Sequence, residues 1–320
     1  MKRALSVFKN MPEYSLEQVV HDWSLIGEYG KDLVDVDATL GSGQAFSWQR
    51  IAKGSWIGQV GADPYALIPG EKNLNVYSPR GSFCAFQEYF QTEFDLEKVF
   101  QSFPPGDLVL ERARCSCPRL RILKQDPWET LVCFLSSSAK PIVQIRKICG
   151  RLRAFYGKEI YPRFFSFPSA EDIIVKGPEG LKQARLGFRA NFIWKVSTIL
   201  SKLKPNLLLE LKDAPTGDIR QILMELPGVG RKIADCVLLF GYGRLEVFPI
   251  DRWMERVLRT FYSPLLKRAQ PSHKELLEFS STYFGPFAGY AQQYLFYWAR
   301  TAFWKKGGLW EYHERDGAKI

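Results

Sequence analysis

Hydrophobic and polar residues alternate along residues 32–78, and this pattern differs from that of the rest of the chain. Glycine and proline steps interrupt the alternation, as in Gly-Ala-Asp-Pro at 61–64 and Pro-Gly-Glu at 69–71. Short runs with a period of two that are bounded by such steps are typical of antiparallel strands joined by turns. The sequence therefore predicts a β-rich first region.

The pattern becomes helical at Asp126. An aspartate can cap a helix, and Pro127 takes the first helical position, where proline is favoured. The apolar residues that follow at helical spacing are Trp128, Leu131, Val132, Phe134 and Leu135. Farther along, residues 289–304 are apolar around most of a helical circumference, which predicts a buried helix. The amide of Gln292 inside it needs a hydrogen-bond partner.

Together these patterns predict an α+β protein that is mostly α. The strand-like and helical patterns meet near residues 104–125, where a Pro-Pro-Gly step and a basic stretch separate them. We therefore expect an N-terminal antiparallel β-sheet domain at residues 1–120, followed by a helical domain at residues 121–320.

The charge balance narrows the class of partner. The 320 residues include 44 Lys and Arg against 34 Asp and Glu, and the net charge of +10 attracts polyanions such as nucleic acid or an anionic membrane surface. No apolar stretch reaches the roughly 18 residues of a membrane span, and the first residues lack the pattern of a signal peptide. We therefore expect an intracellular, soluble protein with no membrane partner.

The six cysteines favour reduced thiols. They are scattered through a chain far longer than a typical disulfide scaffold. Only Cys115 and Cys117 are close together, and neither a second pair nor a flanking histidine completes a zinc site. We expect no metal and no cofactor.

The most informative segment is residues 219–240, which contains Leu-Pro-Gly-Val-Gly at 226–230. Amphipathic patterns flank this step, so we expect two helices joined by a short turn. Gly228 and Gly230 allow positive φ and a close approach of the backbone to phosphate, while the second helix begins with free N–H groups. An ordinary turn between helices is the alternative, but the full motif with Arg231 and Lys232 after it indicates a DNA-binding hairpin.

Lys232 has two interpretations. It either contacts phosphate, as lysines near such hairpins do, or acts as a nucleophile. A free lysine amine has a pKa of about 10.4, so a nucleophilic role requires a lower pKa, which adjacent Arg231 and partial burial would favour. Asp251 follows nineteen residues later, at the end of the apolar stretch Val-Phe-Pro-Ile. It can cap the next helix or assist the lysine.

Residues 226–232 and the Phe-Pro-Ile-Asp stretch at 248–251 resemble the helix-hairpin-helix DNA glycosylases. Members with a lysine at the hairpin position are bifunctional glycosylase/lyases, so the resemblance implies Lys232 and Asp251 as catalytic residues. The endonuclease III branch carries a C-terminal four-cysteine iron–sulfur loop, whereas this chain has no cysteine after Cys236. The 8-oxoguanine glycosylase branch is similar in order along nearly the whole chain, at residues 42–48, 125–127, 186–190, 226–232 and 289–296.

The resemblance also implies a role for each residue at the lesion. The backbone carbonyl of Gly43, in the N-terminal domain, would accept the N7–H that distinguishes 8-oxoguanine from guanine. Gln292 would bind the Watson–Crick edge of the flipped base, and Phe296 and Cys236 would close on its faces. For Phe296, plain core packing is the alternative. The residues implied in DNA contact are Arg189, which would read the orphaned cytosine, and Gly228, Gly230 and Arg231.

In this scheme Lys232 attacks C1′ of the flipped nucleotide and forms a Schiff base, and β-elimination then nicks the strand. The partner is double-stranded DNA that contains a damaged base. We expect a monomer, located in the cytoplasm and nucleoid of a bacterium or in the nucleus of a eukaryote.

Several positions depart from the family pattern. The family has a run of asparagines that fills the gap left by the flipped base, a second cytosine-reading arginine, and a histidine after the catalytic Asp. This chain has in their places Ala139, Lys140 and Pro141, then Gln144, and Trp253. We therefore expect weaker discrimination for cytosine opposite the lesion. The alternative functions are a glycosylase for another damaged purine and a non-catalytic protein that binds DNA lesions.

Overall fold

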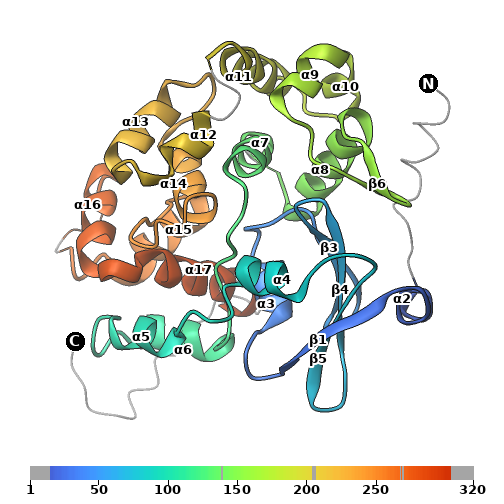
Figure 1. Cartoon of the computed structure of the whole chain (residues 1–320). Helices are drawn as coiled ribbons and strands as arrows, with labels where there is room; N and C mark the ends of the chain where they lie inside the picture. The colour runs from blue at the N-terminus through green and yellow to red at the C-terminus, as the bar shows by residue number, and fades with distance from the viewer. Residues whose placement is uncertain (1–14, 138–139, 204–206, 267, 269, 304–320) are drawn as a thin grey trace.

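The computed structural model describes residues 15–137, 140–203, 207–266, 268 and 270–303 (Figure 1). The strands are β1 (Ser24–Gly30), β2 (Gln49–Ala52), β3 (Ser55–Val60), β4 (Asp63–Pro69), β5 (Asn73–Ser78), β6 (Glu159–Tyr161) and β7 (Phe164–Phe165). The α-helices are α2 (Leu16–Asp22), α3 (Val36–Gly41), α4 (Phe83–Phe90), α5 (Leu96–Gln101), α6 (Leu108–Ser116), α7 (Pro127–Ser137), α8 (Ile142–Tyr156), α9 (Ala170–Lys176), α10 (Glu179–Gln183), α11 (Arg189–Leu203), α12 (Leu207–Glu210), α13 (Thr216–Glu225), α14 (Arg231–Phe240), α15 (Arg252–Val257), α16 (His273–Tyr283) and α17 (Ala288–Trp298). Short 3-10 or π turns are η1 (Leu211–Asp213), η2 (Leu258–Tyr262), η3 (Gly285–Phe287) and η4 (Ala299–Phe303).

The first five strands form an antiparallel sheet in the order β1-β5-β4-β3-β2. Its central strands are buried on both faces. On one face Leu67 packs with Phe86 of α4, and on the other Ala66 packs with Trp23 after α2 and Phe164 of β7. This arrangement confirms the predicted fold class, with an N-terminal antiparallel sheet followed by helices.

One segment of the expected β region is helical. The alternation that began at residue 32 predicted strand, whereas residues 36–41 form α3. Asp35 stands before this helix, and its carboxylate accepts a hydrogen bond from the backbone N–H of Ala38 at 2.9 Å. This N-cap favours helix over a further strand. The helix brings the chain to Gly43.

The second part of the chain is built around α14. All residues from Ile233 to Phe240 are buried, and α14 packs against α7. Fully buried aliphatic side chains such as Leu238 each stabilise the fold by about 1.5–3 kcal/mol. The predicted start of α7 is confirmed, since the carboxylate of Asp126 accepts the Glu129 N–H at 2.8 Å. A helix this firmly packed gives its side chains fixed positions.

The packing crosses the expected boundary between residues 120 and 121. Leu96 of α5 and Leu110 of α6 belong to the same core as Leu131 of α7. Arg121 lies at the junction, only 3% exposed, and its guanidinium donates to the carbonyls of Leu33, Gln91 and Phe94. The division into two domains stays a prediction.

The last buried helix is also present. Residues 288–298 form α17, and η4 continues it to residue 303, whereas Trp304 lies outside the described residues. No helix within the described part is long and apolar enough to cross a membrane. Nor do the described His, Cys, Asp and Glu side chains form a group that could hold a metal ion.

Candidate active site

The hairpin between α13 and α14 has the geometry of an anion-binding turn. Gly228 has a φ of +83°, and a Cβ there would lie 2.5 Å from the Phe192 ring. Both the backbone conformation and the lack of space therefore require glycine. Val229 donates to the carbonyl of Leu226 at 3.0 Å and closes the turn. Gly230 caps α14 without any side-chain hydrogen bond. The first N–H groups of α14 are thus available to a phosphate.

Arg231, which the sequence assigns to DNA contact, also takes part in an ion pair on its own helix. Its Nε donates to Oδ2 of Asp235 at 2.8 Å, while Nε of Arg220 donates to Oδ1 of the same carboxylate at 2.7 Å. Asp235 is 1% exposed, so a buried carboxylate holds two arginines that are 20% and 44% exposed and links α13 to α14. The charge of Arg231 is therefore compensated by Asp235. Sequence reasoning missed Asp235, although an acid four residues after an arginine is a recognisable helical pair.

Lys232 and Cys236 occupy successive turns of one face of α14. The Lys232 ammonium lies 4.8 Å from the centroid of the Phe134 ring and hydrogen-bonds to the Cys236 thiol. Burial raises the pKa of that thiol to about 11, although the Lys232 charge opposes the rise. Cys236 is thus a neutral thiol near neutral pH. It forms an uncharged wall beside the amine.

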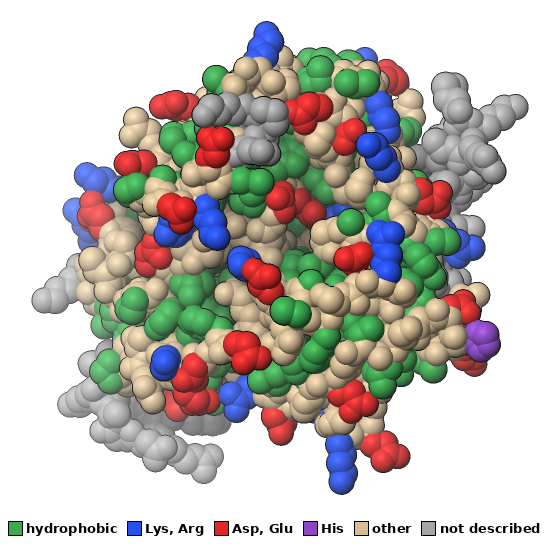
Figure 2. Space-filling model, in the orientation of Figure 1, with side chains coloured by type: hydrophobic (Ala, Val, Ile, Leu, Met, Phe, Trp, Pro, Cys, Tyr) green, Lys and Arg blue, Asp and Glu red, His purple; other side chains and the backbone are tan. Residues whose placement is uncertain are grey.

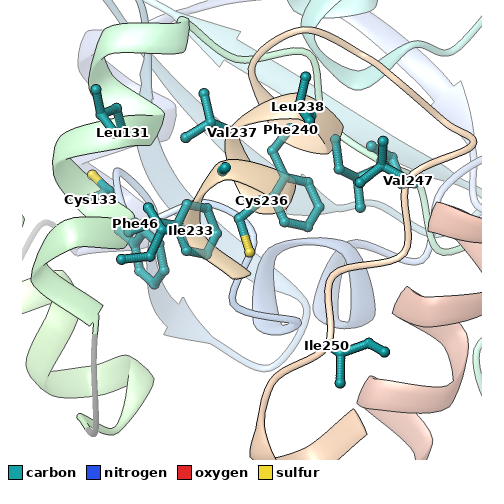
Figure 3. Close-up of a cluster of buried hydrophobic side chains, with 14 of the residues drawn as sticks. Phe46, Leu131, Cys133, Ile233, Cys236, Val237, Leu238, Phe240, Val247 and Ile250 are labelled. Atoms are coloured by element: carbon teal, nitrogen blue, oxygen red, sulfur yellow. The ribbon is translucent and has the colours of Figure 1, made fainter. Parts of the chain in front are cut away.

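Asp251 is the N-cap of α15, as its alternative interpretation predicted. Its Oδ1 accepts from the N–H groups of Trp253 and Met254, each at 2.9 Å. Its charge also acts on Cys236, together with that of Lys232. Figure 3 shows Cys236 on α14, with Val247 and Ile250 on the chain segment that runs beside this helix. The charges of Lys232 and Asp251, which lie on two elements, therefore both act on the Cys236 thiol.

Gly43 lies in the loop after α3 and is glycine for geometric reasons. Its φ is +80°, and a Cβ would lie 2.6 Å from Cδ1 of Ile142 and 4.0 Å from the Phe296 ring. Gly43 of the N-terminal part and Phe296 of α17 are thus neighbours. The structure joins these residues across more than 250 positions of sequence.

Gln44 locks the Gly43 loop in place. Its Nε2 donates to the carbonyls of Thr39 and Arg121 at 2.9 and 2.8 Å, and its Oε1 accepts from Leu123 N–H at 2.9 Å. Its own carbonyl accepts from Gln125 at 2.9 Å. Gln44 is 1% exposed. Because each of these groups is buried and needs its partner, Gln44 fixes the backbone on which Gly43 depends.

Gln292 is 5% exposed, and its Oε1 accepts from Nε2 of Gln293 at 2.8 Å, the partner that a buried amide requires. This bond uses one lone pair of the Gln292 oxygen, and the Gln292 NH₂ group remains a donor. Phe296, one turn later, is half-buried and has the guanidinium of Arg300 at 4.9 Å from its ring centroid. Phe296 therefore packs against the core, as its alternative predicted, and also borders the Gly43 loop.

The residues expected to face the DNA strand opposite the lesion lie on separate helices. Arg189 begins α11, is 8% exposed and has its guanidinium 4.4 Å from the ring centroid of Phe188. Phe188 itself is 68% exposed and contacts Phe192, the ring beside Gly228. Sequence reasoning missed this exposed aromatic. Gln144 is exposed on α8, and Ala139 lies outside the described residues.

The surface charge does not by itself locate the DNA. On the face in Figure 2, Lys and Arg side chains are interspersed with Asp and Glu. A hairpin suited to phosphate, followed by a lysine on its second helix and by an aspartate N-cap on the next helix, is however the arrangement of the helix-hairpin-helix DNA glycosylases.

Comparison with known proteins identifies the branch. Residues 28–131 match the family described as 8-oxoguanine DNA glycosylase, N-terminal domain. The chain is 30% identical over 308 residues to the N-glycosylase/DNA lyase of Saccharomyces cerevisiae, and the alignment covers 80% of this chain and 81% of the yeast protein. It is 27% identical over 275 residues to N-glycosylase/DNA lyase OGG1 of Arabidopsis thaliana, and this alignment covers 81% of this chain and 75% of the plant protein.

A solved structure agrees. MBOgg1, in complex with a low-affinity DNA ligand, superposes with a TM-score of 0.77 at 31% identity and covers 87% of this chain and 98% of its own. The chain belongs to the 8-oxoguanine DNA glycosylase family of N-glycosylase/DNA lyases.

Proposed function

We propose that this protein excises 8-oxoguanine from duplex DNA and then cleaves the strand at the resulting site. The observation that carries the proposal is that Lys232 follows a hairpin suited to phosphate and that its charge and the charge of Asp251 act on the same buried thiol. Family membership supports the same activity. We propose that it acts as a monomer, and its cellular compartment stays a prediction.

The chemistry begins when the Lys232 amine, once deprotonated, attacks C1′ of the flipped nucleotide. The bond from C1′ to N9 breaks, and the base leaves with the electron pair. Asp251 stabilises the positive charge that develops on the sugar and accepts a proton from the amine. The sugar ring opens to a Schiff base on Lys232, and loss of the C2′ proton expels the 3′ phosphate by β-elimination.

Recognition of the base depends on one hydrogen bond. In 8-oxoguanine N7 carries a hydrogen, whereas in guanine N7 is an acceptor. A carbonyl at Gly43 accepts from the first and repels the second. The NH₂ group of Gln292 donates to the Watson–Crick edge, and Phe296 and the neutral Cys236 thiol pack on the two faces.

The exposed ring of Phe188 is suited to insertion between base pairs of the duplex. Apolar side chains inserted between base steps unstack and kink DNA, and extrusion of a base costs a few kcal/mol. Phe188 lies beside the hairpin and next to Arg189, so it can occupy the stack while Arg189 turns toward the orphaned base. With Gln144 in place of a second arginine, this set reads cytosine through Arg189 alone.

A lesion panel tests the proposal. Duplexes with 8-oxoguanine, unmodified guanine or an alkylated purine are incubated with excess enzyme. One half of each sample is then treated with alkali, which cleaves every abasic site, and the other half is left untreated. We expect nicking of the 8-oxoguanine strand without alkali and none of the guanine strand. Excision of only the alkylated purine would assign another substrate. Binding to 8-oxoguanine DNA without any cleavage would make the protein a damage sensor.

A further inference from the structure

Three side chains of the C-terminal helix form one row across the candidate site. Gln292, Phe296 and Arg300 are spaced by four residues, which places them on one face of successive turns. The first two belong to the proposed base pocket. Arg300, in η4, extends the row, with its guanidinium 4.9 Å from the Phe296 ring centroid.

A second arginine from α8 lies beside it. Nη2 of Arg146 donates to the carbonyl of Leu40, at the end of α3, at 2.6 Å, and its guanidinium lies 5.1 Å from the Trp56 ring centroid. Arg146 follows Ile142 by one turn, and Ile142 contacts the Gly43 loop. Arg146 and Arg300 thus both border the place where the Gly43 loop and Phe296 come together, and the charge of Arg300 acts on Arg146.

These two cations lack a carboxylate partner at bonding distance. No salt bridge joins either to any described Asp or Glu, and Nε of Arg146 is buried without a hydrogen-bond partner. Burial lowers the pKa of Arg146 to about 10, with a further contribution from the positive charge of Arg300. Two partly buried like charges without a carboxylate partner are unfavourable unless an anion binds near them.

The position of Arg300 in the row indicates which anion fits. Burial also lowers the pKa of Arg300, and the charge of Asp251 is the main influence that opposes this. Asp251 acts on the sugar in the proposed function, whereas Gly43 and Gln292 address the edges of the base. Gln292 and Arg300 lie at opposite ends of the row, on either side of Phe296. With Gln292 at the Watson–Crick edge, Arg300 is at the end of the row toward the sugar, and the group attached to that sugar is a phosphodiester.

We propose that Arg300, supported by Arg146, binds a phosphate that flanks the flipped nucleotide. Arg300 would act as a positioning residue, because it holds the backbone of the nucleotide while Lys232 and Asp251 act on C1′. A planar guanidinium is suited to this task, since it donates two parallel hydrogen bonds to phosphate oxygens while stacked on an aromatic ring. The inference rests on the proposed function.

The test pairs a protein change with a DNA change. Arg300→Gln is placed in a Lys232→Gln background, where DNA binds without cleavage, and affinity is measured for duplexes carrying 8-oxoguanine or a tetrahydrofuran abasic analogue. Each duplex is made with normal phosphates and with a neutral methylphosphonate 5′ or 3′ to the lesion. Arg80→Gln serves as the matched control, because Arg80 is exposed and paired with Asp63 at the sheet.

We expect Arg300→Gln to weaken binding of both duplexes about tenfold, the loss of one charge-assisted contact, and to reduce the salt slope by about 0.9. With methylphosphonate at the contacted position, Arg300→Gln should cause no further loss. Arg300→Lys should restore the salt slope, and Arg80→Gln should change neither quantity.

Three results would overturn the inference. The first is an affinity loss from Arg300→Gln that adds to the loss from methylphosphonate at both positions. The second is an affinity loss of Arg300→Gln for the 8-oxoguanine duplex alone. The third is a salt slope of the Arg300→Gln variant equal to that of the Lys232→Gln parent. Thermal unfolding of each variant identifies a folding defect, and Arg300→Lys then provides the salt slope in a folded protein. If the wild-type protein fails to excise 8-oxoguanine, the proposed function fails, whatever Arg300 binds.

Discussion

Substitution of Gly43 by alanine should separate the two activities of the enzyme. Alanine in the left-handed region costs roughly 1–2 kcal/mol, and its Cβ, 2.6 Å from Ile142, adds an overpacking cost of about 1–3 kcal/mol. The loop must shift to relieve the contact, and the carbonyl moves with it. A lost hydrogen bond to a buried N7–H costs about 1–3 kcal/mol, or roughly 5- to 150-fold in rate.

Single-turnover rates on two substrates measure the effect. We expect Gly43→Ala to slow excision of 8-oxoguanine by that factor and to leave nicking of a preformed abasic site near the wild-type rate, because an abasic site has no base to read. Gly54→Ala is the matched control. Gly54 has a φ of +71°, and its Cβ would lie 2.9 Å from Pro69 in the sheet, so it carries similar strain away from the site.

The reasoning would be refuted if Gly43→Ala slowed both reactions equally, or if Gly54→Ala reproduced the loss of excision. Both variants should show lower melting temperatures, which confirms that the strain is present in each. The assays are run well below either transition.

Three further predictions concern the hairpin, the thiol and the partner strand. Asp235→Asn leaves Arg220 and Arg231 without their shared carboxylate, and we expect thermal or urea unfolding to show a loss of about 3 kcal/mol, reduced by the exposure of Arg231. An unchanged free energy of unfolding would contradict the role of this triad. Because burial raises the pKa of Cys236, alkylation followed by peptide mass spectrometry should label exposed Cys115 near pH 8 and leave Cys236 unmodified until about pH 11; prompt labelling of Cys236 at pH 8 would disagree. Excision of 8-oxoguanine opposite C, A, G and T should differ by no more than about tenfold, one modest base contact, and a strong preference for cytosine would show that other residues replace the missing readers.

Local signals in the sequence predicted much of this molecule. The glycines of the hairpin, the cap at Asp126 and the cap at Asp251 each act within a few residues, so a short stretch contains both the cause and the effect. The same holds for the β-turns between strands. Helix α3 was missed because the Asp35 cap prevailed over a weak alternation.

The remaining features depend on contacts between distant segments. Gln44 bonds the strand-side loop to the linker around residue 121, and no spacing within either segment shows this. The charge of Arg300 acts on Arg146 only when α8 and η4 both pack near the Gly43 loop. Arg231 was assigned to DNA from its position after the hairpin, but a buried acid on the same helix competes for it.

The central claim is that the Lys232 amine becomes bonded to the sugar. Borohydride added during reaction with an 8-oxoguanine duplex reduces a Schiff base to a stable protein–DNA adduct, and peptide mass spectrometry locates the modified residue. We predict an adduct on Lys232 that is lost in Lys232→Gln and retained in Lys98→Gln, a change at an exposed lysine of α5. Strand cleavage without a trapped adduct, or an undiminished adduct in Lys232→Gln, would contradict the account.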